Sequence, residues 1–367
     1  MPSDRLAFLL PDMGGGGAER VALSLIKSFV ARGYRVDLLL MSVRGELLPL
    51  LPAEVEIIDL GATRIRGVVR PLAKYLARAR PAALHISMWP LTVAGVIAGL
   101  VSRSRTRIIV ADHSALSKQY AGRGSAHRRF LRWSMRLLYP RADARVVVAV
   151  DTARDLSALS GLPLESFEVI HNPVDPPNSA SPAPDIALLW SGTTGRRILS
   201  VGRMTAEKNQ LLLLEAFAEL AESSDVRLAI LGDGALRGEL EKRARKLGVA
   251  DRVNMPGFVI DPAPYYRSAN LFVLSSNFEG YPLVLIEAMR CGLPIVSTDC
   301  VSGPAEILGG GEFGRLAPCN DPDALAAAMQ AELATPTDAK LLEARAEELS
   351  GAHTTARYLE LMTGEKR

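Results

Sequence analysis

Glu279 and Glu287 lie eight residues apart in the segment SSNFEGYPLVLIEAM, whose pattern suits the binding of a phosphorylated ligand. The pattern predicts that Glu279 ends a strand, that the chain then turns, and that Glu287 lies on the following helix. Amides at such a helix start can meet a phosphate, and a carboxylate about one turn further in can bind hydroxyl groups. A glutamate in so apolar a helix would be costly to bury without such a partner. The residues predicted to meet the ligand at the turn are Gly280, Tyr281, Pro282 and Leu283.

Two cations, Arg203 and Lys208, follow another predicted strand in the segment ILSVGRMTAEKNQ. A turn leads from them into a helix, so we expect both charges to converge on one spot. A diphosphate leaving group needs positive charge in the transition state, and a guanidinium with an ammonium group supplies it without a metal ion. The alternative for such a basic pair is a solvated loop that binds nothing.

Glycines 14–17 follow the first predicted strand and open the first predicted helix. Exposed amides there can bind an anion. The run lacks the strict G-x-G-x-x-G pattern, so nicotinamide-cofactor binding is disfavoured; the alternative is a flexible turn.

His113 follows the strand of TRIIVADH, although a single histidine is more often structural than catalytic. His171 and Asp233 are assigned structural roles, a tether at a turn and a helix cap.

Short apolar runs alternate with helical patterns along the whole chain, which is typical of parallel sheets covered by helices on both faces. A proline-rich break at 171–185 separates two such series. We therefore predict a first domain at 1–172, completed by a C-terminal helix at about 352–364, and a second domain at 173–351. Ligands of such sheets lie at the carboxyl ends of the strands, so a cleft is expected between the domains.

The composition is that of a globular protein, with 48% hydrophobic and 23% charged residues in 367. The three cysteines are isolated, which predicts neither a zinc site nor a disulfide framework and fits the cytoplasm; no membrane-spanning segment is expected. Residues 1–175 hold 24 basic and 15 acidic residues, whereas residues 176–367 hold 19 and 25. A basic first half can face phosphates, nucleic acid or an anionic membrane, and its charge alone does not choose among them.

Two basic amphipathic segments account for much of that charge, at 68–81 and 126–141. The second joins several arginines to Phe130 and Trp133 at helical spacing. Such a helix can lie in an anionic membrane interface, which would suit a lipid acceptor. The alternative is a core helix with a solvated basic face.

Together, the segments GGGGAER, ADHS, HNPVD, VGRMTAEKN, GDG and FEGYPLVLIEAM resemble, in their order, the retaining family-4 glycosyltransferases of the GT-B architecture. The resemblance covers nearly the whole chain, and its Glu-x7-Glu segment is the most specific part. It implies an α/β fold of two Rossmann-like domains whose C-terminal helix returns to the first. The first domain (1–172) would bind the acceptor and the second (173–351) the nucleotide-sugar donor. It also implies that Arg203 and Lys208 bind the diphosphate, Glu287 the ribose and Glu279 the donor sugar. The remaining implied site residues are Phe258 beside the base, Gly16 and Gly17 near the diphosphate or acceptor, and His113 near the sugar's primary hydroxyl.

The resemblance further implies transfer of a sugar from a nucleotide sugar to an acceptor hydroxyl, with retention and an α-linkage. A UDP-sugar donor and a lipid-linked saccharide or polysaccharide precursor as acceptor are favoured, without metal, other cofactor or nucleic acid. The isolated cysteines predict a cytoplasmic location, and the basic segments 68–81 and 126–141 suggest peripheral contact with the inner face of the membrane. The alternatives are a GDP-mannose-type mannosyltransferase, an epimerase of the same fold, and a sugar-nucleotide-binding protein without activity.

Overall fold

A computed structural model describes residues 4–173, 186–191, 195–349 and 352–364. The chain divides into two compact units, Met1–Pro173 with Gly351–Arg367, and Val174–Ser350. From residue 174 on, the expected proline-rich connector at 171–185 lies outside the described residues. We call the two parts unit 1 and unit 2.

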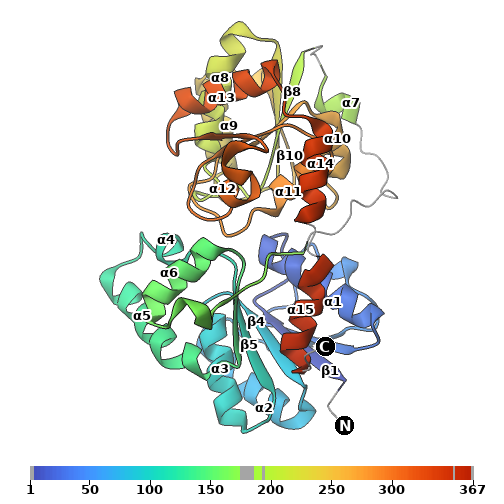
Figure 1. Ribbon diagram of the computed structural model, residues 1–367, viewed down its shortest axis with the longest axis vertical. Helices are drawn as coiled ribbons and strands as arrows, with labels where there is room; N and C mark the ends of the chain where they lie inside the picture. The colour runs from blue at the N-terminus through green and yellow to red at the C-terminus, as the bar shows by residue number, and fades with distance from the viewer. Residues whose placement is uncertain (1–3, 174–185, 192–194, 350–351, 365–367) are drawn as a thin grey trace. The chain divides into compact units, whose positions relative to one another are not determined.

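Unit 1 is built on a parallel sheet with the strand order β3-β2-β1-β4-β5-β6-β7 (Figure 1). Its strands are β1 (Arg5–Leu10), β2 (Arg35–Leu40), β3 (Glu56–Asp59), β4 (Ala83–Ser87), β5 (Arg107–Asp112), β6 (Ala144–Val147) and β7 (Glu168–Val169). Its helices are α1 (Gly17–Ala31), α2 (Val69–Ala79), α3 (Leu91–Ser102), α4 (Leu116–Gln119), α5 (Ser125–Leu138), α6 (Val150–Ser160) and α15 (Ala352–Thr363).

Unit 2 repeats this design with a parallel sheet in the order β10-β9-β8-β11-β12-β13. Its strands are β8 (Arg196–Val201), β9 (Val226–Leu231), β10 (Val253–Gly257), β11 (Leu271–Leu274), β12 (Ile295–Thr298) and β13 (Arg315–Ala317). Its helices are α7 (Ile186–Leu189), α8 (Gln210–Ser223), α9 (Arg237–Lys246), α10 (Ala263–Ser268), α11 (Leu283–Arg290), α12 (Pro304–Ile307), α13 (Pro322–Ala334) and α14 (Ala339–Glu348).

The central strands are continuously apolar because helices cover both faces of each sheet. In β1, every residue from Leu6 to Leu10 is fully buried, and the same is true of all of β11 to within a few per cent. A strand with one face in water would instead alternate polar and apolar residues. The predicted α/β fold of two Rossmann-like units is therefore confirmed.

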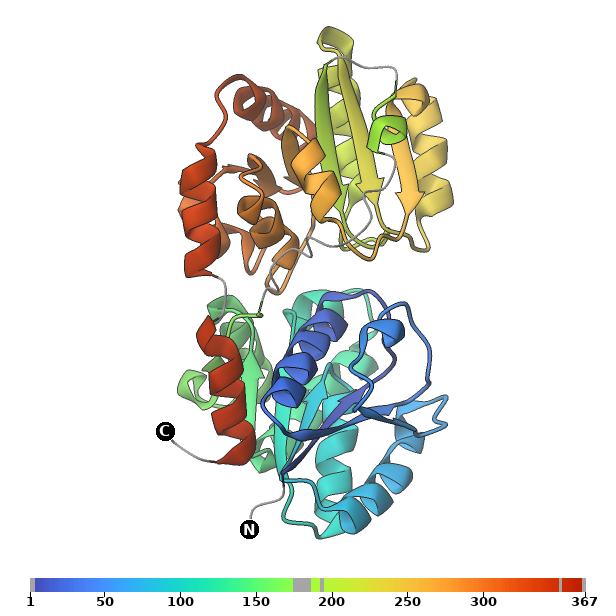
Figure 2. The ribbon, with the colours of Figure 1, turned by 90° about the vertical axis from the view of Figure 1, so that its right-hand side faces the viewer.

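The C-terminal helix α15 packs on unit 1, beside α1, β4 and β5 (Figures 1 and 2). Tyr358 and Met362 are fully buried, and the Tyr358 ring lies 5.5 Å from the ring of His85 in β4. Arg107 Nε donates to the carbonyl of Leu361 at 3.1 Å. Residues from the end of the chain thus complete the core of its first unit, as the sequence predicts.

Three local expectations need correction. The short edge strands β7 and β13 were not expected, because two or three residues give no recognisable pattern. The apolar run ARVVVAV at 144–150 predicts a single strand, but β6 ends at Val147 and α6 begins at Val150. Glu279 does not end a strand either, because β11 ends at Leu274 and Glu279 lies in the loop beyond it.

In both sheets successive strands are first added on one side and then on the other, so the strand order changes direction between two adjacent strands. The reversal lies between β1 and β4 in unit 1 and between β8 and β11 in unit 2. The loops that follow such a strand pair run to opposite sides and leave a crevice at the carboxyl ends, where ligands of doubly wound sheets bind. The predicted site residues should therefore follow these strands.

Candidate functional site

Lys208 and Glu279 meet at the switch point of unit 2, one from the loop after β8 and one from the loop after β11. Lys208 Nζ lies 2.6 Å from Glu279 Oε1, and the two side chains are 22% and 8% exposed. Ser276 Oγ donates to the same carboxylate oxygen at 2.6 Å. No described residue donates to Oε2 of Glu279, so that oxygen is available to a ligand hydroxyl.

Hydrogen bonds between the two loops hold this pair in place. Asn209 Nδ2 donates to Asn277 Oδ1 at 3.0 Å, and the amide of Asn277 donates to the carbonyl of Glu207 at 2.8 Å. Ser275 Oγ donates to the carbonyl of Lys208 at 3.0 Å. The charged pair therefore rests on loops that are tied together before any ligand arrives, which keeps the reorganisation on binding small.

Arg203, the second predicted cation, extends from the same loop but is exposed. None of the described carboxylates forms an ion pair with its guanidinium. Its carbonyl accepts a hydrogen bond from the buried Gln210 Nε2 at 2.9 Å, which fixes the backbone. The sequence expectation that the two cations converge on one spot stays a prediction. Lys208 has an acidic partner, whereas no described carboxylate pairs with Arg203.

Glu287 lies on α11, and its carboxylate is held from the side by Tyr266 of α10. Tyr266 Oη donates to Glu287 Oε2 at 2.9 Å. The tyrosine is 1% exposed and packs against Phe272 of β11 with ring centroids 5.5 Å apart. The half-buried glutamate therefore has a partner in the protein, which lowers the cost of placing it in an apolar helix.

The turn before α11 is shaped by close backbone packing. Ser302 Oγ donates to the carbonyl of Gly280 at 2.9 Å, and Gly303 has a φ of 96°. A Cβ at Gly303 would come within 2.5 Å of Pro282 Cδ, so only glycine fits there. Leu283 begins the helix after the N-cap Pro282. The amide of Leu285 donates to the Pro282 carbonyl at 3.0 Å, whereas the amides of Leu283 and Val284 have no acceptor within the helix.

The side chain of Tyr281 points into the protein rather than towards a ligand. It is 4% exposed, and burial raises the pKa of its hydroxyl above its usual value, with a further contribution from Glu306. Only its backbone remains to meet a phosphate, which is the part that the sequence pattern assigned to that task.

Phe258 follows β10, beside a glycine that joins two loops. Gly257 has a φ of 97°, and its carbonyl accepts from the amide of Gly232 at 2.8 Å. Phe258 is half-buried next to this junction. Asp233, predicted to cap a helix, instead accepts from the Gly234 amide at 2.7 Å within the loop, because α9 begins only at Arg237.

The glycine loop of unit 1 is held at its base and open at its tip. The amide of Met13 donates to the carbonyl of Arg44 at 2.9 Å, and a Cβ at Gly45 would overlap Met13. Gly16 is the N-cap of α1, where a Cβ would come within 2.5 Å of Glu19 Oε2. A Cβ at Gly17 would meet no atom within 4 Å. The open side of the loop at Gly17 can therefore admit a ligand.

His113 follows β5 in unit 1, on a different unit from the charged pair. Burial lowers its pKa to about 4, against a smaller opposing effect of Asn172. Neither ring nitrogen of His113 has a hydrogen-bond partner among the described residues, and the same holds for the fully buried His85. At neutral pH the His113 imidazole is uncharged, so it can accept or donate a hydrogen bond to a substrate hydroxyl but carries no charge.

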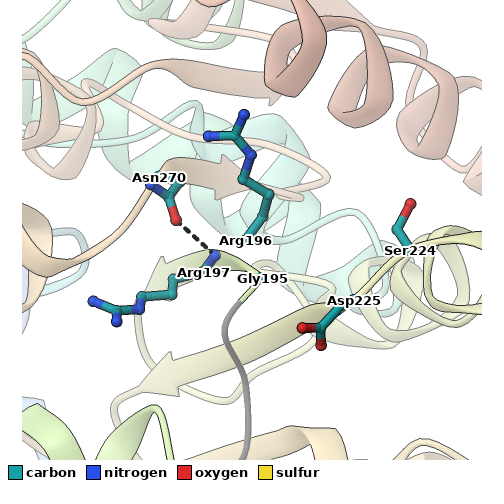
Figure 3. A pocket seen from close by; sticks show the side chains of 6 residues that line it. All are labelled: Gly195, Arg196, Arg197, Ser224, Asp225 and Asn270. Atoms are coloured by element: carbon teal, nitrogen blue, oxygen red, sulfur yellow. Dashed lines mark hydrogen bonds between the residues drawn. The ribbon is translucent and has the colours of Figure 1, made fainter.

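An open hollow also exists at the other end of the sheet of unit 2. It is lined by Gly195, Arg196, Arg197, Ser224, Asp225 and Asn270, at the amino ends of β8 and β9 and the start of β11 (Figure 3). The amide of Arg197 donates to Asn270 Oδ1 at 2.9 Å, and the two arginine side chains leave the strand in different directions (Figure 3). Doubly wound sheets bind ligands at the opposite edge, so the hollow is not the donor site.

The described residues contain no group of three or more His, Cys, Asp or Glu side chains that is arranged to hold a metal ion. None of the helices in the described ranges is both long and apolar enough to cross a bilayer.

Several supporting residues escaped the sequence analysis. Ser276 and Asn277 were passed over as parts of a strand end, and Tyr266 lies on α10, far along the chain from Glu287. The segment SSN before the glutamate was a usable signal for the first two. No sequence signal connects Tyr266 to Glu287, because the contact depends on how two helices pack.

Two doubly wound units in one chain, with a charged site at the switch point of the second, define a GT-B fold. In agreement, the chain is similar to Anabaena HepE solved with UDP and glucose, with a TM-score of 0.83 over 98% of this chain and all of that one, at 20% identity. At this identity the likeness shows the fold.

The family is shown by sequence. The model of Glycosyltransferase Family 4 matches residues 15–177, and the model of Glycosyl transferases group 1 matches residues 191–348. The chain therefore belongs to these glycosyltransferases. It is 29% identical, over 85% of both chains, to the N-acetylgalactosamine-N,N'-diacetylbacillosaminyl-diphospho-undecaprenol 4-alpha-N-acetylgalactosaminyltransferase of Campylobacter jejuni. It is also 29% identical, over 80% of both, to the amylovoran biosynthesis glycosyltransferase AmsD of Erwinia amylovora.

Proposed function

We propose that this glycosyltransferase moves a sugar from a UDP-sugar to a hydroxyl of a lipid-linked saccharide, with retention of configuration and an α-linkage. The observation that carries the proposal is the Lys208–Glu279 pair at the switch point of unit 2. An ammonium group held by a carboxylate at 2.6 Å is ready to exchange that partner for a diphosphate. Lys208 and the exposed Arg203 then stabilise the charge that develops on the leaving group.

The remaining residues of the donor site have distinct proposed roles. Glu287, oriented by Tyr266, binds the ribose hydroxyls, and Phe258 lies beside the base. Glu279 exposes one carboxylate oxygen for the donor sugar, while the first amides of α11 receive the phosphate. The neutral His113 binds the sugar's primary hydroxyl, and the loop at Gly16 and Gly17 approaches the diphosphate or the acceptor.

The donor and acceptor classes are supported by relatives. The Campylobacter relative is named as an α-transferase acting on a diphospho-undecaprenol-linked saccharide, and HepE was solved with UDP. We propose that transfer needs no metal ion, because Lys208 and Arg203 supply the positive charge that a metal would bring. Full transfer activity in the presence of a chelator is the expected result.

A thermal-shift screen of UDP-, GDP- and ADP-sugars tests the donor. A ligand at about one hundred times its Kd stabilises the folded state by about 2.7 kcal/mol, so the correct nucleotide raises the melting temperature most. A larger shift with GDP-sugars would replace the proposal with a GDP-mannose-type donor. Turnover then separates the remaining alternatives: an epimerase converts the donor without an acceptor, and a binding protein shifts the melting curve but produces no product.

Retention is tested on the product. The proton spectrum of the new linkage should show the α-anomeric configuration of the donor. A β-linked product would overturn the retaining mechanism while leaving the donor assignment intact.

A further inference from the structure

The outer face of α5 exposes large apolar side chains that the described residues of unit 1 leave largely uncovered. Phe130, Trp133 and Leu137 are 48%, 61% and 39% exposed. At about 3.6 residues per turn they form one stripe along the helix. The buried face is a different one, formed by Leu131 and Met135. An exposed apolar stripe of this size on a soluble surface marks a contact site.

Cations adjoin this stripe. Residues 113–142 contain seven basic and no acidic residues. All seven side chains are exposed, and no described carboxylate forms an ion pair with any of them. They are Lys118, Arg123, Arg128, Arg129, Arg132, Arg136 and Arg141. The face of α5 therefore offers unneutralised positive charge next to apolar surface.

The other basic helix, α2, differs. Arg70, Lys74 and Arg78 are exposed along one stripe, while Leu72 and Leu76 are buried on the opposite side. No large apolar side chain of α2 is exposed, and all of this helix belongs to the described residues. It has a solvated basic face, which was the alternative that the sequence left open for both helices.

The exposed face of α5 is connected to the carboxyl edge of the sheet in unit 1. Trp89, which follows β4, donates from Nε1 to Ser134 Oγ at 3.1 Å. Its ring centroid lies 5.9 Å from that of Phe130 and 4.9 Å from that of Tyr120. A packed aromatic chain thus leads from the exposed stripe to the strand ends where ligands of such a sheet bind.

We propose that the exposed face of α5 docks onto an anionic phospholipid bilayer, with Phe130, Trp133 and Leu137 entering the acyl boundary and the arginines contacting lipid phosphates. Charge complementarity selects this occupant, because the unpaired cations need anions that a neutral bilayer does not supply. A second copy of the chain would place arginine against arginine and is disfavoured. The proposal rests on the lipid-linked acceptor proposed above and names the surface that brings the enzyme to it.

Tryptophan fluorescence provides a direct test on the full chain. Of the three tryptophans, Trp133 is 61% exposed, whereas Trp89 and Trp190 are each 3% exposed. Because the Trp89 ring contacts Phe130, the Trp133→Phe variant is the control, and it should lose the change in emission. Vesicles that contain phosphatidylglycerol should shift the emission to shorter wavelength, and vesicles of phosphatidylcholine alone should not. No shift with either kind of vesicle, together with no cosedimentation, would overturn the proposal.

Two matched triple variants separate the helices. Each cation near an anionic surface is worth about five-fold in binding, so Arg129→Ser with Arg132→Ser and Arg136→Ser should weaken cosedimentation about one-hundred-fold. Arg70→Ser with Lys74→Ser and Arg78→Ser, on α2, should weaken it less than about three-fold. Equal losses in the two variants would overturn the assignment to α5. Melting curves of both variants confirm that they are folded.

The apolar part is tested with Phe130→Ser and Leu137→Ser together, which retains Trp133 as the reporter. Vesicle binding should fall at least about ten-fold, while transfer to a water-soluble acceptor analogue stays at the wild-type rate. If instead the wild type forms dimers that this variant disperses, and neither binds vesicles, the face serves self-association and the proposal is wrong. A chain that binds vesicles but turns over no nucleotide sugar would refute the proposed function and leave the docking surface in place.

Discussion

The two units carry nearly the same sheet order but different side chains at the carboxyl ends of their strands. In unit 2 the switch point holds a charged pair, Lys208 and Glu279, whose loops are tied by hydrogen bonds. In unit 1 the corresponding loops carry a more exposed pair, Arg44 with Asp12 at 3.1 Å, and also His113, whose ring nitrogens have no hydrogen-bond partner among the described residues. The scaffold fixes where a ligand can bind, and the loops decide what it is.

The net charge of each half of the sequence does not match the charge of the residues proposed to bind the ligand. The sequence is basic in its first half and acidic in its second, yet the cations proposed to bind the diphosphate lie in the acidic half. The excess positive charge of unit 1 lies instead on outer helices such as α2 and α5. Binding of a particular anion therefore follows from a few positioned side chains and not from the charge of the whole unit.

Removal of the Lys208 ammonium group should have the largest effect on activity. Without such an effect, the proposed contrast between the two units would be wrong. For Lys208→Ala we expect kcat to fall by about one hundred- to one thousand-fold, because charge on the leaving group loses its stabilisation. The melting temperature should be affected less than kcat, since Lys208 itself is 22% exposed and Ser276 still donates to the buried Glu279. Lys242→Ala, on the exposed side of α9, is the control. Equal kcat in both variants would remove Lys208 from the site.

The buried histidine His85 of unit 1 should make the free energy of unfolding depend on pH in the acid range. Burial lowers the pKa of His85 to about 3, with a smaller effect of His113. The ring is thus neutral in the folded state, whereas in the unfolded chain it takes up a proton below about pH 6.5. This contribution to stability is complete above pH 6.5 and is lost as the pH falls towards 3, on the order of 3 kcal/mol between pH 7 and pH 4.

His85→Phe tests that contribution, because phenylalanine keeps the aromatic contacts with Phe8 and Tyr358 but does not titrate. Melting curves of the full chain between pH 7 and pH 4 should fall less steeply for the variant than for the wild type. Asp112, whose pKa burial raises to about 6, contributes with the opposite sign in both proteins and cancels in the difference. Parallel curves would show that His85 is not held neutral by the fold.

The smallest effect is expected at Glu287, the residue of unit 2 that we propose binds the ribose. Glu287→Ala should weaken binding of free UDP about ten-fold or more, since hydrogen bonds to a charged group are worth about 1.5 to 3 kcal/mol. Tyr266→Phe removes only the hydroxyl that orients Glu287 and should cost less, a few-fold. Calorimetry with UDP measures both, and kcat at saturating donor should change little. A larger loss in Tyr266→Phe than in Glu287→Ala would contradict this order.

Most of the fold could be predicted from the sequence, because its strongest signals are local. Buried parallel strands give continuous apolar runs, and helices such as α8 and α9 show their periodicity within about three turns. The edge strands β7 and β13 and the true end of β6 were missed, since in short segments hydrogen bonding to a neighbour decides the conformation.

The site was predicted only in part, because the spacing of residues along the chain does not show which distant residues meet. Spacing placed Lys208 after β8 and Glu287 on α11, but it did not reveal that Lys208 is paired with Glu279 or that Tyr266 holds Glu287. These contacts join residues far apart in sequence. The two basic helices also look alike as sequences, and only burial shows that α5 exposes Phe130 and Trp133 whereas α2 exposes cations alone.

The sequence by itself determined the class of fold, the family and the residue types available for chemistry, because apolar periodicity, turn residues and motif spacing are properties of short segments. The tertiary structure decided which of those residues meet. Side chains such as Lys208 and Glu279 become partners because β8 and β11 are neighbours in the sheet although β9 and β10 lie between them in the chain. Long-range strand order is set by the packing of the whole core, which no short segment encodes.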